Sequence, residues 1–238
     1  MNIALILSGG TGTRLGANIP KQYLEVKNRM IITYCIDMFN SNKNVDGIWI
    51  VAARDWILPI LDNLSANNIP LDKILGFSNP GDNRQLSILN GLNDIRAYIQ
   101  DTINDLYIFD ENIVIIHDAA RPNLSSDFVD KCLDAIEGHD GVMPVLPMKD
   151  TVYISEDGAT VSGLLNRSTV FAGQAPELYR LDKYIDANNK LLPDKILKIN
   201  GSTEPAVLAG LDVAIIPGDE NNYKITTAND LVKFTQGS

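Results

Sequence analysis

Short runs of apolar residues recur along the chain, and each ends at a glycine or at a polar residue. Continuous apolar runs of this length are typical of strands that are buried on both faces of a parallel sheet. The expected strands cover residues 3–7, 47–52, 74–77, 113–116, 142–145 and 213–216.

Between these runs the apolar residues recur with the period of an α-helix. The expected helices cover residues 30–40, 56–64, 87–99, 128–136, 179–191, 202–209 and 227–234. Strands that alternate with helices predict a three-layer α/β fold around a mostly parallel, twisted sheet with right-handed crossovers. We expect one such domain over residues 1–238.

The pattern changes between about residues 145 and 171. Val152, Ile154, Val161 and Leu164 alternate with polar residues around the turn at 156–158, which predicts a β-hairpin that protrudes as an arm. A thin hairpin cannot bury these side chains by itself, and an exposed apolar strand edge favours pairing. We therefore expect a homodimer in which the arm forms much of the interface.

The chain has a formal net charge of −10, which argues against non-specific binding to nucleic acid or to an anionic membrane. A local basic cluster for phosphate substrates stays compatible with this charge. No apolar run approaches the ~18 residues of a membrane helix. Cys35 and Cys132 lie in apolar helical patterns and are expected to be buried free thiols, so we expect a reducing compartment and a cytoplasmic protein.

A glycine-rich segment, Leu7 to Arg14, follows the first strand directly. Glycines let backbone N–H groups approach a phosphate chain closely, and Arg14 would add a fixed charge. The spacing fits neither the dinucleotide-binding pattern nor the Walker pattern. An ordinary glycine turn is the alternative for this segment taken alone.

Two further residues have positions suited to phosphate chemistry. Lys21 follows Pro20 shortly after the glycine segment and could hold a triphosphate, although a lysine taken alone is more often a surface residue. Asp118 ends a central strand, where ligands bind in open α/β sheets, and a carboxylate there suits Mg²⁺. We interpret the neighbouring His117 as structural and give His139 no role.

Six motifs occur in order over nearly the whole chain, together with an arm that carries Arg167: LSGGTGTRLG, IPKQYL, GDNRQLSI, IHDAARP, KDTV and NYKITT. In these motifs the chain resembles the cytidylyltransferases of the IspD/TarI family, which act on 2-C-methylerythritol 4-phosphate or ribitol 5-phosphate. The resemblance implies a Rossmann-like nucleotidyltransferase fold. It also implies that CTP is joined to a polyol phosphate with release of pyrophosphate, with Mg²⁺ as cofactor.

The resemblance also implies roles for individual residues. The residues implied to hold the nucleotide are Ser8, Gly9, Gly10, Gly81, Asp82 and Ser87, of which the last three read the cytosine. The implied catalytic cations are Arg14, Lys21 and Lys224. Asp118 is the implied metal ligand, and the implied acceptor-binding residues are Asp118, Arg121, Thr151 and Arg167. Cations suit this reaction because in-line attack on the α-phosphorus crowds negative charge, so catalysis is mainly positioning and electrostatic stabilisation.

The chain departs from the family pattern at two places. Thr203-Glu204-Pro205 stands where the family usually has Thr-Asp, and Ala175-Pro176-Glu177 stands where it usually has Thr-Pro-Gln. Gly173-Gln174 is more similar to the ribitol branch, as are further positions in the first half of the chain: Gly9-Gly10, Ile19-Pro20 and Trp56. These positions favour a ribitol-type acceptor over 2-C-methylerythritol 4-phosphate.

Two other functions remain open at this point. A hexose-1-phosphate nucleotidyltransferase that uses UTP or another triphosphate would share the glycine-rich loop, but it resembles this chain less in HDAARP and NYKITT. A catalytically inactive nucleotide-binding regulatory protein is supported only by the changed Glu204-Pro205 segment. A protein of that kind should have lost some of the charged residues Arg14, Lys21, Asp118, Arg167 and Lys224, all of which are present.

Overall fold

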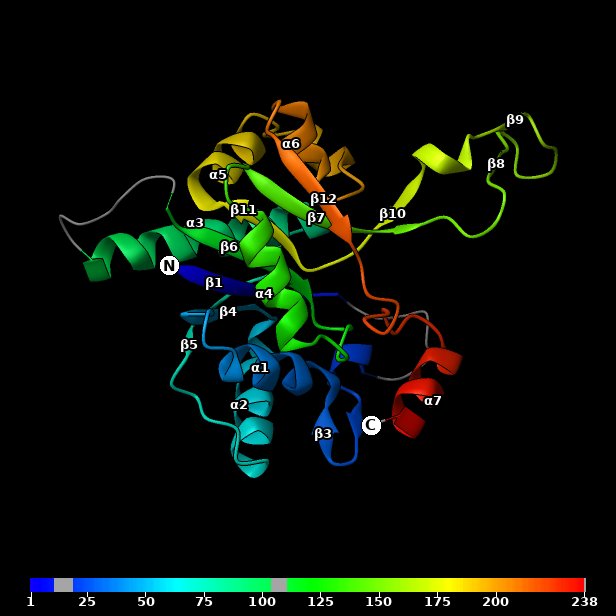
Figure 1. Cartoon of the computed structure of the whole chain (residues 1–238). Helices are drawn as coiled ribbons and strands as arrows, with labels where there is room; N and C mark the ends of the chain where they lie inside the picture. The colour runs from blue at the N-terminus through cyan, green and yellow to red at the C-terminus, as the bar shows by residue number, and fades with distance from the viewer. Residues whose placement is uncertain (11–18, 104–110, 238) are drawn as a thin grey trace.

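The computed structural model describes residues 1–10, 19–103 and 111–237, so Arg14 lies outside the described residues. One eight-stranded sheet forms the centre, in the order β10-β7-β11-β6-β1-β4-β5, and β12 also pairs with β7 (Figure 1). The strands are β1 Asn2–Leu7, β4 Gly47–Val51, β5 Ile74–Ser78, β6 Ile113–Asp118, β7 Gly141–Pro147, β10 Phe171–Gly173, β11 Glu177–Arg180 and β12 Val213–Pro217.

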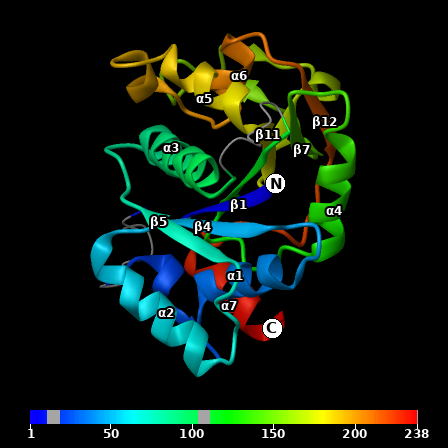
Figure 2. The ribbon, with the colours of Figure 1, turned by 90° about the vertical axis from the view of Figure 1, so that its left-hand side faces the viewer.

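Helices cover both faces of this sheet, as Figure 2 shows. On one face α1 (Ile31–Ser41), α2 (Ile57–Ala66) and α4 (Ser126–Ala135) pack into one apolar cluster. On the other face α3 (Arg84–Ile103), α5 (Leu181–Asn189) and α6 (Glu204–Leu208) pack into a second cluster. The three-layer α/β fold is therefore confirmed, and the two clusters explain why the central strands are apolar on both sides.

The strands at the centre of the sheet run in parallel, so their carboxyl ends meet at one edge. β1 pairs in parallel with β4 and with β6, which places Leu7 opposite both Val51 and Asp118. β11 runs antiparallel to β6 and to β7, so its amino-terminal end reaches this same edge. The segments after β1 and β6 and before β11 are thereby brought together.

The helices begin within three residues of the predicted starts, and two of the differences have a clear physical reason. The expected helix 179–191 starts only at Leu181, because residues 177–180 form the buried strand β11. α3 starts at Arg84 rather than at residue 87, because Asn83 Oδ1 accepts a hydrogen bond from Leu86 N (2.8 Å) and so caps the first turn. A small hairpin, β2 (Glu25–Val26) and β3 (Arg29–Met30), was not predicted; its turn residues Lys27 and Asn28 have positive φ.

The predicted arm is a β-hairpin that projects from the body (Figure 1). β8 (Tyr153–Ile154) pairs antiparallel with β9 (Gly163–Leu164). Apolar side chains on the hairpin are well exposed, with 60% for Tyr153, 68% for Val161 and 64% for Leu164. The remaining helix, α7 (Ala228–Gly237), packs beside α1. Within the described residues, no helix combines the length and apolar character needed to cross a membrane.

Candidate active site

A cavity of about 590 Å³ lies at the edge where β1 and β6 end. This is the place where open α/β sheets bind ligands. The predicted residues that line it are Gly9, Gly10, Lys21, Gly81, Asp82, Ser87, Asp118 and Lys224. The fold thus brings together residues that are separated by more than 200 positions in the sequence.

The glycine segment forms one wall of the cavity, and hydrogen bonds with buried polar groups hold it in place. Ser8 Oγ donates to the carbonyl of Val51 (2.8 Å), and the hydroxyl of Tyr23 donates to the carbonyl of Ser8 (2.9 Å). The amide of Gln22 donates to the carbonyls of Ser8 (2.5 Å) and Gly10 (2.7 Å). Ser8 is therefore placed as a support of the loop, and sequence reasoning did not identify the role of Gln22.

Gly9 is required by close packing. A Cβ atom at this position would lie 2.5 Å from Cβ of Pro80, so any side chain would push the loop away from the turn that precedes α3. The glycine loop and this turn are the two sides of the cavity, and Gly9 lets them approach each other.

The turn at residues 79–83 is shaped by a serine of α3. Ser87 Oγ accepts from the backbone N–H of Gly81 (3.0 Å) and donates to the carbonyl of Asn83 (2.8 Å). Gly81 and Asp82 then face the cavity. Ser87 holds the turn and also lines the cavity, so the three residues predicted to read a base lie on one structural unit.

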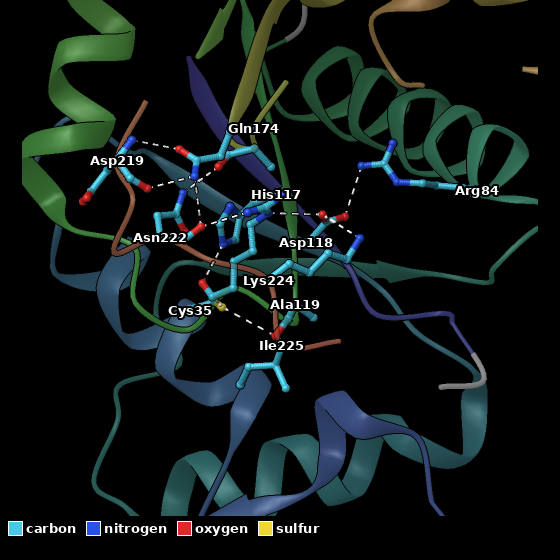
Figure 3. Close-up of polar contacts among 12 residues, drawn as sticks. Cys35, Arg84, His117, Asp118, Ala119, Gln174, Asp219, Asn222, Lys224 and Ile225 are labelled. Carbon is cyan, nitrogen blue, oxygen red and sulfur yellow. Dashed lines mark hydrogen bonds and ion pairs between the residues drawn. The ribbon is translucent and has the colours of Figure 1, made fainter. Parts of the chain in front are cut away.

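Three cations surround the carboxylate of Asp118. Arg84 Nη2 lies 3.1 Å from Oδ1, while Lys224 Nζ lies 3.0 Å and Arg121 Nε 3.5 Å from Oδ2 (Figure 3). Burial acts to raise the pKa of Asp118, but the charges of Arg84, Lys224 and Arg121 outweigh it and hold this pKa far below its usual value. Asp118 is therefore ionised and fixes the cations around it.

Lys224 belongs to residues 222–227, which we call the terminal strap. Ile225 lies in its middle, where its backbone N–H donates to the carbonyl of Ala120 (2.8 Å) and its carbonyl accepts from Lys21 Nζ (2.6 Å). Arg121 Nη1 donates to the carbonyl of Asn222 (2.8 Å). The terminal strap thus carries one of the cations and gives hydrogen-bond acceptors to two more.

A buried amide fastens the first end of the terminal strap. Gln174 Nε2 donates to the carbonyls of Asp219 (2.8 Å) and Asn222 (3.3 Å), and its Oε1 accepts from Asp219 N (2.9 Å) (Figure 3). Asn222 Nδ2 donates to the carbonyl of Ala175 (2.7 Å). Because Gln174 follows β10, the base of the arm is tied to the segment that leads to Lys224.

His117 has the structural environment that we expected. Its ring is fully buried, packs edge-on against Phe39, and contacts the carbonyl of Arg121 through Nε2 (3.1 Å). Burial lowers the pKa of His117 to about 4, so the ring is neutral at neutral pH. His139 lies elsewhere, at the surface beside Asp212.

The arm residues predicted to bind the acceptor do not reach this cavity in the described chain. Thr151 is exposed, and Arg167 donates from Nη1 to the carbonyl of Lys149 (2.7 Å) at the base of the arm. The physical reason is the direction of the hairpin, which projects away from its own body (Figure 1). Within one chain, the structure therefore separates these two residues from Asp118 and Arg121.

The family model described as IspD, 2-C-methyl-D-erythritol 4-phosphate cytidylyltransferase, matches residues 2–235. The chain belongs to this family. It is a cytidylyltransferase of the IspD/TarI type, as the sequence motifs predicted. It is thus a nucleotidyltransferase enzyme, and the comparisons give no support to an inactive regulatory protein.

Curated relatives carry both of the acceptor names that the motifs suggested. The chain is 31% identical over 234 residues to a 2-C-methyl-D-erythritol 4-phosphate cytidylyltransferase of Rubrobacter xylanophilus, covering 97% of this chain and 91% of the relative. It is 32% identical over 234 residues to a ribitol-5-phosphate cytidylyltransferase of Streptococcus pneumoniae, covering 97% and 96%.

Solved structures of the family have the same fold. A 4-diphosphocytidyl-2C-methyl-D-erythritol synthase from Anaerococcus prevotii superimposes with a TM-score of 0.78 at 24% identity, covering 99% of this chain and 94% of that one. The Francisella tularensis cytidylyltransferase superimposes with a TM-score of 0.77 at 24% identity, covering 100% and 99%. At this level of identity the likeness supports the fold.

One residue that departs from the IspD/TarI pattern, Glu177, lies in a polar cluster with Tyr179 and Thr203, whereas Glu204 accepts from the exposed backbone N–H of Asn200. Glu177 Oε2 accepts from the hydroxyls of Tyr179 (3.2 Å) and Thr203 (3.2 Å), and its charge acts on Arg84. Arg84 therefore lies in the field of two carboxylates, Asp118 and Glu177. Sequence reasoning gave Arg84 no role, although it stands in the motif GDNRQLSI.

Among the described residues, this cytidylyltransferase offers a metal ion one carboxylate at the predicted position, that of Asp118. The described residues contain no group of three or more His, Cys, Asp or Glu side chains arranged to hold a metal ion. Both oxygens of Asp118 already face cations. Asp118 therefore fits Mg²⁺ only as one ligand, with phosphate oxygens of the substrate as further ligands. This is a usual arrangement for Mg²⁺.

Proposed function

We propose that this enzyme joins CTP to a polyol phosphate of the ribitol 5-phosphate type and releases pyrophosphate. The observation that carries the proposal is the cavity, in which a glycine loop, the turn at 79–83 with the start of α3, and the cations around Asp118 face one another. Anionic substrates require such a local basic cluster on a protein whose net charge is −10.

The reaction follows from this arrangement. An oxygen of the acceptor phosphate attacks the α-phosphorus of CTP, a new P–O bond forms, and the bond from the α-phosphorus to the bridging oxygen of pyrophosphate breaks. Lys21, Lys224 and Arg14 would stabilise the negative charge that develops. Backbone N–H groups of Gly9 and Gly10 would hold phosphate oxygens. Mg²⁺ bound with the triphosphate and Asp118 would supply further positive charge.

The choice of acceptor rests on particular positions. Gly9-Gly10, Ile19-Pro20, Trp56 and Gly173-Gln174 support the ribitol-type acceptor, as does the Streptococcus pneumoniae relative. The alternative, 2-C-methyl-D-erythritol 4-phosphate, is supported by the Rubrobacter xylanophilus relative. Pyrophosphate release with CTP and each acceptor in parallel decides between them. A higher kcat/KM with ribitol 5-phosphate is expected, and a higher value with the methylerythritol acceptor overturns this preference.

We expect CTP to be preferred over UTP by about a hundredfold or more in kcat/KM, because a site built to pair with the cytosine amino group leaves a polar group unpaired with uracil. The turn that carries Gly81 and Asp82 supports this expectation. Asp82→Asn should weaken the preference, whereas Asp72→Asn, an exposed carboxylate outside the cavity, should leave it unchanged. Equal kcat/KM for the two nucleotides would contradict base reading.

The exposed apolar arm supports a homodimer in which the arm of one chain reaches the site of the other. Arg167 and Thr151, which lie away from the cavity of their own chain, would then meet the acceptor phosphate of the partner. Light scattering should give about twice the 26.1 kDa of one chain, and a monomer mass at micromolar concentration would exclude the dimer.

Subunit mixing tests the shared site directly. Arg167→Ala and Lys21→Ala subunits should each be nearly inactive alone, and their mixed dimers should recover part of the activity. This recovery is expected because one of the two sites then combines an intact arm with an intact cavity. Sites that are self-contained would give no recovery.

A further inference from the structure

The terminal strap continues directly into α7, and one carboxylate joins the two. Asp230 Oδ2 accepts from the backbone N–H and the hydroxyl of Thr226 (2.9 and 2.9 Å) and from the same two groups of Thr227 (2.7 and 2.9 Å). Thr227 Oγ1 accepts in return from Asp230 N (3.2 Å). This reciprocal pair is a capping box at the start of α7.

The carboxylate of Asp230 is charged under all ordinary conditions. Burial acts to raise its pKa, but hydrogen bonds from the backbone and side chains of Thr226 and Thr227 lower it to about 2. Hydrogen bonds to an ionised acceptor are roughly twice as strong as neutral ones. The end of the terminal strap is therefore held tightly to the first turn of α7.

α7 is itself fixed to the body of the protein. Phe234 is buried, packs edge-on against Tyr34 of α1 with ring centroids 5.0 Å apart, and belongs to the same apolar cluster as Ile225. Ile225 is also bonded to Ala120 through its N–H. Lys224 thus lies next to a residue anchored in the core, and the chain after it is anchored by Asp230.

We propose that Asp230 is a positioning residue for nucleotidyl transfer, which holds the terminal strap so that Lys224 stays at Asp118 and faces the cavity. Lys224 Nζ is 3.0 Å from Asp118 Oδ2, and its side chain is 37% exposed. A lysine with this much exposure depends on its backbone for its position. The proposal rests on the proposed function, since Asp230 acts through Lys224.

Loss of the carboxylate frees four hydrogen-bond donors at the end of the terminal strap. A displacement of a catalytic group by about 1 Å can cost about a hundredfold in rate. We therefore expect Asp230→Ala to lower kcat by about ten- to a hundredfold, with a much smaller change in KM for CTP. Asp230→Asn keeps one acceptor oxygen and should lose less.

The experiment is a double-mutant cycle on the full-length enzyme. Asp230→Ala is measured in the wild type and in Lys224→Ala, with Asp37→Ala, an ion-paired carboxylate on α1, as the matched control. If Asp230 acts through Lys224, its removal lowers kcat at least tenfold in the wild type and less than about twofold in Lys224→Ala. The control should stay near wild-type activity, and circular dichroism should show that every variant is folded.

Each other outcome is decisive. An equal fall in kcat in both backgrounds would mean that Asp230 acts on the whole fold. An unchanged kcat would mean that Lys224 keeps its position without the hydrogen bonds to Asp230. If Asp230→Ala fails to fold, Asp230→Asn in the same two backgrounds gives the same comparison. Wild-type turnover in Lys224→Ala alone would remove Lys224 from the mechanism and overturn this proposal, whereas no pyrophosphate release by the wild type with CTP and a polyol phosphate would count against the proposed function.

Discussion

Replacing Lys21 by alanine is expected to lower kcat with CTP several hundredfold. Lys21 lines the cavity at the glycine loop, and the carbonyl of Ile225 orients its ammonium group. A preorganised charge at the position where negative charge develops is typically worth about 3–4 kcal/mol in the transition state. Steady-state measurement of pyrophosphate release gives the value.

The affinity for CTP should change less than kcat, because the charge on the α-phosphorus develops in the transition state. Lys43→Ala removes an exposed lysine at the end of α1 and is the matched control. Because Lys21 also contacts the terminal strap, thermal unfolding of each variant must show that the fold is kept. Turnover near the wild-type value in a folded Lys21→Ala enzyme would remove Lys21 from the mechanism.

Asp118→Asn should lower both activity and stability, although the new side chain has nearly the same shape. The carboxylate is largely buried and is surrounded by Arg84, Arg121 and Lys224. Removing one partner from a buried ionic group typically costs about 3–5 kcal/mol. Arg84 and Lys224 are each more than a third exposed, so we expect a value near the lower end. Activity should fall at least about a hundredfold, because the cations lose their common anchor.

The pH dependence gives an independent check on Asp118. Its pKa lies far below the ordinary value, so the stability that it contributes is complete above about pH 4 and is lost only as the pH falls toward the folded pKa. The difference in unfolding free energy between wild type and Asp118→Asn should therefore be constant from about pH 5 to 8. Asp37→Asn, which affects a more exposed pair, is the control. A difference that vanished at pH 5 would mean that Asp118 is not held ionised by its neighbours.

The central strands could be predicted from the sequence because both of their faces are buried. β1 from Ile3, β4 from Ile48 and β6 as far as Ile116 are unbroken apolar runs, and β6 then continues into His117 and Asp118 at the edge of the sheet. β11 could not be separated from α5, since its four residues continue without a break into the helix. Pairing with β6 and β7, both distant in the sequence, makes it a strand.

The candidate site also divides into residues that local sequence patterns mark and residues that only distant contacts reveal. Lys21 and Asp118 could be found because a glycine segment and a strand end mark their surroundings. Arg84, Gln22 and Gln174 act through contacts with residues that local patterns do not connect to them. Arg167 is held at the base of the arm by a hydrogen bond to the carbonyl of Lys149, a contact that no local sequence pattern indicates.

The reactivity of the buried Cys35 thiol can report on the opening of the chain around Asp118 and Arg121. Its Sγ lies 3.4 Å from the carbonyl of Arg121, it is fully buried, and burial raises its pKa to about 12. A thiol reagent reacts with the thiolate, so modification of Cys35 must wait until the chain around Asp118 and Arg121 opens. The rate at which Cys35 is labelled therefore measures local opening of this part of the chain. Substrates that hold Asp118 and Arg121 in place should lower the labelling rate without any contact with the sulfur.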